Sequence, residues 1–193
     1  DNYITGSGSL TKTGAGTLRF YQPSGDWSGF TADLAVNGGT LHLHLANDVL
    51  TNVGNLSVDG AFFNLQYGQD NVPTGDITLN NANFRWWMGD TLANSFTLSG
   101  SNTLDHAKDG RGLMEISGLI SGSGSLLVES DPGDHVRFSN DGNTYTGQIS
   151  LGVNGDVLEF TSIANEGIAS ALGAPTGPDA TLKFAGSTYR YVG

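Results

Sequence analysis

The feature that most constrains this chain is a segment that returns, in degraded form, about 117 residues further on. Three short stretches recur in the same order: Gly6–Leu10 as Gly122–Leu126, Leu18–Phe20 as Val136–Phe138, and Leu34–Leu41 as Leu151–Leu158. The spacing between copies changes by only one residue either way. An ordered repeat of this kind indicates that one supersecondary unit is used twice, so a repetitive architecture is expected.

A shorter period lies between the two copies. Three similar short strands, each followed by a turn of small residues and a second strand, are expected at Leu56–Val58, Ile77–Leu79 and Phe96–Leu98. About 20 residues per repeat, with no room for a helix, is typical of a β-solenoid with one coil per repeat. A β-sandwich would instead join neighbouring strands by tight hairpins, and the best hairpin signal here is Asn154-Gly155.

The amino-acid composition limits the binding partners that this chain can have. The 29 glycines among 193 residues fit many turns, and 14% charged residues is too few for a disordered chain. A net charge of -11 argues against nucleic acid and acidic polysaccharides, which need a basic face. Without cysteine there is no disulfide or thiolate metal site, and no apolar run approaches the ~18 residues of a membrane helix.

The C-terminal part has a different pattern. Ala164–Gly173 is the one stretch with helical spacing, and Gly173 and Pro175 would end such a helix. Strands are expected at Thr181–Phe184 and Thr188–Tyr191. An atypical terminus suits a solenoid, whose end must be covered. With no linker in view, residues 1–193 are expected to form a single domain, and the start at Asp1 reads as a mature or excised module.

Several motifs resemble a known family. Gly8–Leu18 closely resembles the autotransporter-associated β-strand repeat, Asn143–Gly147 resembles its next element, and Ser170–Pro175 with Gly186–Gly193 resembles the segment that often follows. The resemblance implies a right-handed parallel β-helix in a secreted or cell-surface bacterial protein, without a single activity. An isolated β-helix of this size is also similar in general character to the xylan-binding modules of some bacterial glycoside hydrolases.

Aligning the middle strands by their turns predicts two outward ladders, each with one residue per coil. The first comprises His42, Asn64, Arg85 and Thr103, and the second comprises His44, Gln66, Trp87 and Asp105. Rungs about 4.7–4.9 Å apart would form an open polar strip a few sugar units long. The aromatic, amide, imidazole and charged groups suit a neutral glycan, whereas the alternative is a solvated outer face.

Aromatic residues sharpen this hypothesis. Adjacent strand residues face opposite sides, so one of Trp86 and Trp87 should be core and the other exposed, with a one-residue slip exchanging them. Tyr67 extends the same edge. Trp27 and Tyr145 occupy equivalent turns of the two copies and are interpreted as structural plugs.

Catalysis and metal binding are weaker hypotheses. Asp105–Gly112 is a dense polar cluster with the parts of a lyase or hydrolase, but no pair of suitably spaced carboxyls is evident. The acidic turns Asp131–Asp134 and Ser139–Asn143 offer oxygens for Ca²⁺ without matching a known loop, and no other cofactor is expected.

The sequence thus favours a non-catalytic carbohydrate-binding module for a neutral plant polysaccharide, with xylan suggested by the second resemblance and an attached catalytic domain expected. The alternatives are a stalk or adhesin segment of an autotransporter-like protein, and a β-helical lyase or hydrolase. The carbohydrate-binding residues expected are His42, His44, Asn64, Gln66, Tyr67, Arg85, Trp86, Trp87 and Asp105.

Overall fold

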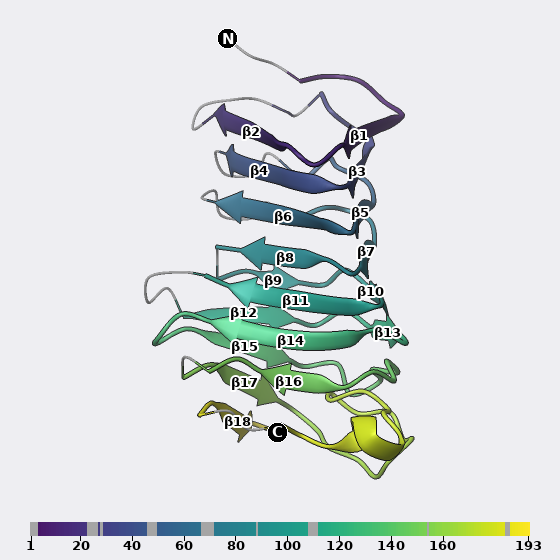
Figure 1. The fold of residues 1–193 in the computed structure, drawn as a ribbon, viewed down its shortest axis with the longest axis vertical. Coiled ribbons are helices and arrows are strands. Elements are labelled where there is room, and N and C mark those ends of the chain that lie inside the picture. Colours follow the sequence, from purple (N-terminus) through teal and green to yellow (C-terminus); the bar gives the residue numbers. More distant parts are fainter. Residues whose placement is uncertain are drawn as a thin grey trace.

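The computed structural model describes residues 4–22, 27, 29–45, 50–66, 72–87, 89–107, 112–153, 155–183 and 186–193. It confirms the all-β parallel β-helix. The strands of the described residues form three sheets in which successive coils stack in parallel, as Figure 1 shows from the N-terminus at the top to the C-terminus at the bottom.

Each coil contributes one strand to each sheet that it reaches. The six-stranded sheet contains β1 (Ser9–Thr13), β3 (Asp33–Asn37), β5 (Leu56–Asp59), β7 (Ile77–Asn80), β10 (Phe96–Ser99) and β13 (Ile120–Gly122). The seven-stranded sheet contains β2 (Thr17–Gln22), β4 (Gly39–Leu45), β6 (Ala61–Gln66), β8 (Asn83–Trp86), β11 (Ser101–His106), β14 (Ser125–Ser130) and β16 (Ile149–Leu151). The five-stranded sheet contains β9 (Thr91–Leu92), β12 (Leu113–Ile116), β15 (His135–Phe138), β17 (Val157–Phe160) and β18 (Thr188–Tyr191).

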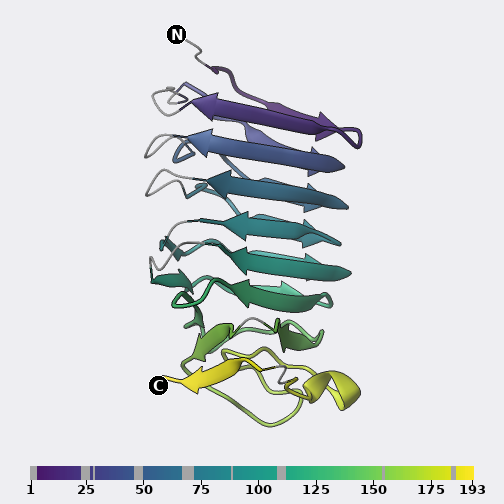
Figure 2. The ribbon, with the colours of Figure 1, turned by 60° about the vertical axis from the view of Figure 1, so that its left-hand side comes forward.

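The sequence repeat is displaced by one sheet between its two copies. The first copy places its strands β1 and β2 in the six- and seven-stranded sheets, whereas the matching strands β14 and β15 lie in the seven- and five-stranded sheets. The next pair, β3 and β4, corresponds in the same way to β16 and β17. The six-stranded sheet therefore belongs mainly to the N-terminal coils and the five-stranded sheet to the C-terminal coils, while the seven-stranded sheet runs through both (Figures 1 and 2).

The core is a set of columns in which like positions of successive coils stack. Leu41, Phe63, Phe84 and Leu104 form one such column beneath the seven-stranded sheet. The Phe63 and Phe84 rings stack with centroids 5.5 Å apart. Stacked apolar rungs bury the inward half of each alternating strand, which is why a period of two suffices to specify the coil.

Trp27 and Tyr145 are buried, as expected of plugs. Trp27 is 1% exposed and packs edge-on against Phe20 and Phe30, with ring centroids 5.3 and 5.7 Å away. Tyr145 is fully buried at the matching point of the second copy, ahead of β16. Both rings are thus part of the packed hydrophobic core.

The predicted helix at Ala164–Gly173 is wrong. This segment forms turns, with the Ile168 amide bonded to the Asn165 carbonyl and the Gly173 amide to the Ser170 carbonyl. Gly167 and Gly173 have φ of 75° and 80°, values that a helix does not use. A 3₁₀ turn, η1 (Gly177–Ala180), follows it. The described residues hold no helix long and apolar enough to cross a membrane.

The expected last strands are only partly formed. Thr188–Tyr191 forms a strand as predicted, β18, and it pairs with β17. Of Thr181–Phe184, Lys183 makes a single parallel bridge to Ser150, and Phe184 lies outside the described residues.

Candidate functional site on the outer face of the seven-stranded sheet

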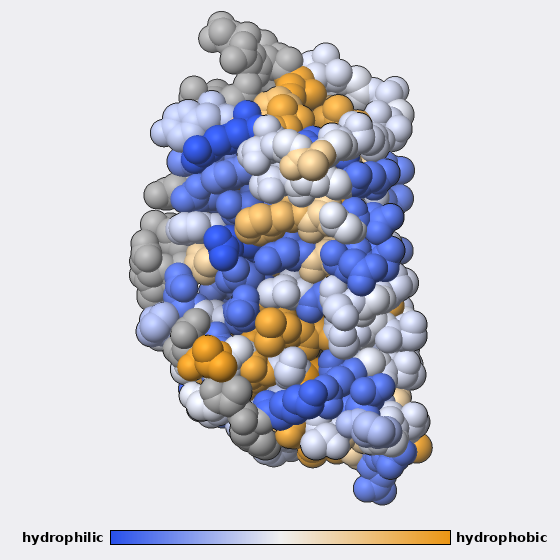
Figure 3. Space-filling view, viewed as in Figure 1, coloured by the Kyte–Doolittle hydropathy of each residue, from blue (hydrophilic) through white to orange (hydrophobic). Residues whose placement is uncertain are grey.

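The predicted polar strip lies on the outer face of the seven-stranded sheet, which faces the viewer in Figures 1 and 3. Alternation in β4 buries Leu41 and Leu43 and leaves His42 and His44 partly exposed, as predicted. In Figure 3 hydrophilic side chains cover much of this face, and the most strongly hydrophobic areas, in orange, lie near the top and in the lower half. The face is therefore polar where the ladders were expected.

The register of β11 differs from the predicted alignment by two residues. Thr103 lies opposite Asn83 and Asp105 opposite Arg85, so Thr103 is not the rung after Arg85. Asp105 consequently belongs to the first ladder, not to the second ladder beside Trp87 as predicted. A two-residue shift keeps each side chain on its predicted face but changes its neighbours.

Asn102 accounts for part of this shift. The chain between Gly100 and Thr103 is one residue longer than the corresponding corner of β8, and Asn102 is buried there at 3% exposure. Its side-chain oxygen accepts from the Ala82 amide at 3.1 Å, and its amide group donates to the Ser99 carbonyl at 3.0 Å. The buried side chain thus replaces ladder hydrogen bonds and accommodates the extra residue.

With the observed register, the first ladder is longer than predicted, and the second gains Tyr21 and loses Asp105. The first ladder comprises Arg19, His42, Asn64, Arg85, Asp105 and Glu129, and the second comprises Tyr21, His44, Gln66 and Trp87. Sequence reasoning missed Tyr21, Arg19 and Glu129. Aligning Leu18 of β2 with Leu41 of β4 would have found the first two, because both strands alternate in the same way.

Diagonal hydrogen bonds link the two ladders. The His42 Nε2 and Gln66 Oε1 atoms are 2.9 Å apart, and the Trp87 indole nitrogen donates to Asn64 Oδ1 at 2.9 Å. Each bond joins a first-ladder residue to the second-ladder residue one coil further on. Long and aromatic side chains can span such diagonals. The side chains are therefore held in place by one another.

An ion pair forms the next rung of the first ladder. Arg85 contacts Asp105 Oδ2 through Nε and through Nη2, both at 2.6 Å. Asp105 is only 6% exposed, and its burial raises the pKa of the carboxyl even though the Arg85 charge acts in the opposite direction. The Arg85 guanidinium also lies 5.4 Å from the centre of the Phe62 ring. This arginine is therefore positioned from two sides.

The Trp86–Trp87 pair is now assigned. Trp86 is fully buried, stacks on Phe84 with centroids 5.4 Å apart, and donates from its indole nitrogen to Asp90 Oδ2 at 3.1 Å. Trp87 is partly exposed on the outer face. Trp86 therefore belongs to the core and cannot touch a ligand on this face, whereas Trp87 can. Tyr67, the remaining aromatic residue of the prediction, lies outside the described residues.

The N-terminal end of the strip carries basic groups. The rings of Tyr21 and His44 are in contact, with centroids 4.4 Å apart. Burial lowers the pKa of His44, and the nearby His42 and Arg19 lower it further. His44 is therefore uncharged at neutral pH, and Arg19 contributes the lasting positive charge at this end.

The C-terminal end of the strip is acidic. Burial raises the pKa of Glu129, and the neighbouring Asp105 and Asp156 carboxylates raise it further. His106, which the sequence grouped with Asp105, points into the core, where it is fully buried with Nδ1 3.1 Å from the Trp86 carbonyl oxygen. Residues 108–111 of the predicted polar cluster lie outside the described residues. The described part of that cluster is thus divided between the two sides of the sheet.

Polar side chains of the acidic turns bond to backbone groups of neighbouring segments. Asp134 Oδ1 accepts from the Gly112 amide, and the buried Asn143 side chain bonds to the Ile120 amide and the Ala171 carbonyl. Among the residues with described positions there is no group of three or more His, Asp or Glu side chains arranged to hold a metal ion. The calcium hypothesis remains a prediction.

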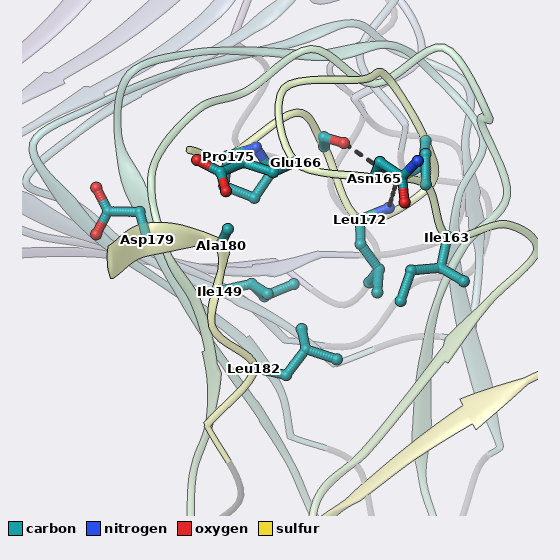
Figure 4. Close-up of a pocket in the computed structure, with 12 residues that line it drawn as sticks. Ile149, Ile163, Asn165, Glu166, Leu172, Pro175, Asp179, Ala180 and Leu182 are labelled. Carbon is teal, nitrogen blue, oxygen red and sulfur yellow. Dashed lines mark hydrogen bonds between the residues drawn. The ribbon is translucent and has the colours of Figure 1, made fainter. Parts of the chain in front are cut away.

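A pocket lies away from the strip, beneath the C-terminal turns. It encloses about 420 Å³ of empty space when the open solvent at its mouth is included. Ile149, Ile163, Leu172 and Leu182 surround the hollow in Figure 4, with Glu166 and Asp179 among the other lining residues. Glu166 accepts a hydrogen bond from the Gly177 amide, so its carboxylate helps to fix the turn. This pocket has no connection with the two ladders.

These features define a class of protein, namely a parallel β-solenoid with one polar face that spans its coils. At the level of sequence, the chain is similar to a protein described as "Adhesin BmaC autotransporter" from Brucella suis biovar 1 (strain 1330), with 31% identity over 175 residues. The matched stretch is 91% of this chain but 4% of that adhesin, so the chain spans a small part of its relative's length.

Other comparisons add no further relative. No family model and no solved structure matches the chain. The adhesin and the solenoid fold together support the resemblance to autotransporter-associated β-helices. The general likeness to xylan-binding modules finds no support.

Proposed function

We propose that this chain is a segment of the rod-shaped, cell-surface or secreted part of an autotransporter adhesin, with a structural and adhesive role. The similarity to an adhesin over 91% of the chain supports the class of protein. A role as a xylan-binding module attached to a glycoside hydrolase has no such support, so the adhesin or stalk segment is the better interpretation.

The observation that carries the proposal is the distribution of exposed apolar side chains. All but one of the strongly exposed large hydrophobic residues in the described chain lie on the end coils, the exception being Leu119. They are Leu18 and Tyr21 at the N-terminal end, and Val153, Ile163, Ile168, Tyr191 and Val192 at the C-terminal end. Exposed apolar surface that lies mainly toward the two ends supports the proposal that further coils adjoin this segment.

The last strand shows the same open end. Tyr191 continues the inward column of Phe138 and Phe160, yet it is 60% exposed. Within the described residues no strand lies beyond β18, so one edge of its backbone is unpaired. Such an edge is a template for another strand. A segment inside a longer rod would have this geometry.

The proposal includes no catalytic step. Asp105 and Glu129 are neighbours on the outer face, as a pair of acid and base would be. Asp105 is nearly buried, however, and one of its oxygens receives both contacts from Arg85. A carboxylate closed off in this way is poorly placed to exchange protons with a substrate.

Hydrogen exchange tests the continuation of the rod. In the full-length protein that contains this segment, the amides of β18 should exchange more slowly than in the isolated chain, because a following strand would accept or cover them. The amides of β11, in the middle of the stack, serve as the matched control and should not change. Equal exchange of β18 in the two proteins would contradict the proposal.

Surface exposure is tested on intact bacteria. Antibodies raised against residues 1–193 should label unpermeabilised cells of the source organism, and their Fab fragments should reduce adherence. Labelling that appears only after lysis would rule out a surface role. Labelling without any effect on adherence would leave the structural part of the proposal and remove the adhesive part.

A further inference from the structure

We propose that Trp87 and the polar side chains around it, namely Asn64, Gln66 and Arg85, form a binding platform for a sugar ring of a neutral polysaccharide. This inference rests on the proposed adhesive function and names the chemical class of its ligand. These four residues are called the Trp87 platform below.

The indole of Trp87 lies back across the sheet. Trp87 follows β8 in the second ladder, and its amide bonds to the Leu65 carbonyl at 3.1 Å, which continues the strand pairing. Its indole nitrogen reaches diagonally to Asn64 Oδ1, on the preceding coil. Asn64 is only 7% exposed although it points outward, because neighbouring side chains cover it. Trp87 itself is partly exposed, so part of its indole is open to solvent on the outer face.

The polar groups of the platform are already ordered. Asp105 forms an ion pair with Arg85, whose side chain is 35% exposed. The His42 ring nitrogen Nε2 is hydrogen-bonded to the side-chain oxygen of Gln66. The Arg85 guanidinium is further positioned against Phe62. Because these side chains lose little freedom when a ligand arrives, binding carries a smaller entropic cost than it would at a flexible surface.

The chemistry of the platform fits a pyranose. The C–H face of a sugar ring is apolar and flat enough to lie on an indole, while its hydroxyl groups can bond to amide and guanidinium groups at the margin. A polyanionic glycan fits less well, because the chain has a net charge of -11 and Asp105 and Glu129 occupy the adjoining rungs. The geometry therefore points to an uncharged polysaccharide.

Affinity gel electrophoresis of the isolated chain tests the proposal. The gels contain soluble arabinoxylan, mixed-linkage β-glucan, galactomannan or, as a charged probe, alginate. We expect at least one neutral glycan to retard the chain, and alginate not to do so. Trp87→Ala should weaken the retarding interaction about 3- to 10-fold, as expected for the loss of one aromatic contact. Trp87→Phe should have an intermediate effect.

The matched control is Tyr191→Ala, which removes another exposed aromatic side chain from the far end of the solenoid. It should leave glycan retardation unchanged, and near-UV circular dichroism should confirm that all variants are folded. The proposal is overturned if no neutral glycan retards the chain, if Trp87→Ala is retarded as strongly as wild type, or if alginate alone binds. None of these outcomes alters the exchange rates of β18, so the proposed rod is tested separately.

Discussion

Replacing each of the adjacent tryptophans by alanine should produce very different losses of stability. Trp86→Ala removes a fully buried ring that stacks on Phe84 and bonds to Asp90. Removal of a large aromatic side chain from a packed core costs about 3–5 kcal/mol. Trp87→Ala removes a partly exposed ring that donates a hydrogen bond to Asn64, and should cost about 1 kcal/mol.

Thermal unfolding followed by calorimetry measures the difference. In a chain of this size each kcal/mol shifts Tm by about 2–4 °C, so a loss of about 4 kcal/mol for Trp86→Ala lowers Tm by about 8–16 °C. Trp87→Ala should lower Tm by about 2–4 °C. Similar shifts for the two variants, or a larger one for Trp87→Ala, would show that the assignment of the two faces is wrong.

Fluorescence gives an independent check on the same assignment. The chain has three tryptophans, of which Trp27 and Trp86 are 1% and 0% exposed. Acrylamide should therefore quench mainly the emission of Trp87. The fraction of emission that acrylamide can reach should fall sharply in Trp87→Ala. If it remains, another tryptophan is accessible and the reasoning fails.

Three further predictions concern single buried polar groups. No described residue bonds to the buried hydroxyl of Tyr145, so Tyr145→Phe should raise Tm by about 2–4 °C, equivalent to about 1 kcal/mol. The control Tyr21→Phe, at an exposed ring, should leave Tm unchanged. A lower Tm for Tyr145→Phe would contradict this prediction. Because the pKa of Asp105 is raised in the folded state, the folded chain binds more protons than the unfolded chain, and the contribution of Asp105 to stability falls as pH rises through the interval between its ordinary and raised pKa. Melting wild type and Asp105→Asn as the pH rises from about 4 should show a steeper decline in wild type, and parallel curves would refute it. Asn102→Ala should lower the free energy of unfolding by about 2 kcal/mol, because it leaves the Ala82 amide without its acceptor. Calorimetry should show a Tm lower by about 4–8 °C, and an unchanged Tm would exclude this structural role.

Alternation along the strands predicted which side chains face outward, but it did not predict their neighbours. His42, Asn64, Gln66 and Arg85 lie where the pattern placed them. A period of two fixes the face of a side chain, whereas its rung depends on the length of each corner. One extra residue at Asn102 altered the alignment of β11, and nothing in a hydrophobic pattern reveals that a buried amide will replace the missing backbone bonds.

The C-terminal turns were misjudged for a related reason. Ala164–Gly173 has apolar residues at helical spacing, but Ile168 is strongly exposed whereas Leu172, four residues further on, is buried. The spacing therefore reflects no buried helical face. Gly167 and Gly173, with positive φ, redirect the backbone instead. Local spacing predicts a helix only where a core is available to receive its apolar side.

The displaced repeat also determines how the solenoid would carry tension. Hydrogen bonds between coils run along the long axis, so a pull on the two ends loads the sheets lengthwise. Within the described residues, only the seven-stranded sheet runs through both parts of the stack, from β2 to β16. The other two sheets overlap along the axis only in the middle of the stack, where the coils that contain β8, β11 and β14 contribute strands to both. Force entering through one of them must therefore cross to the other through the coils around β11 and β14, which makes this splice the part of the molecule where load is shared by three sheets.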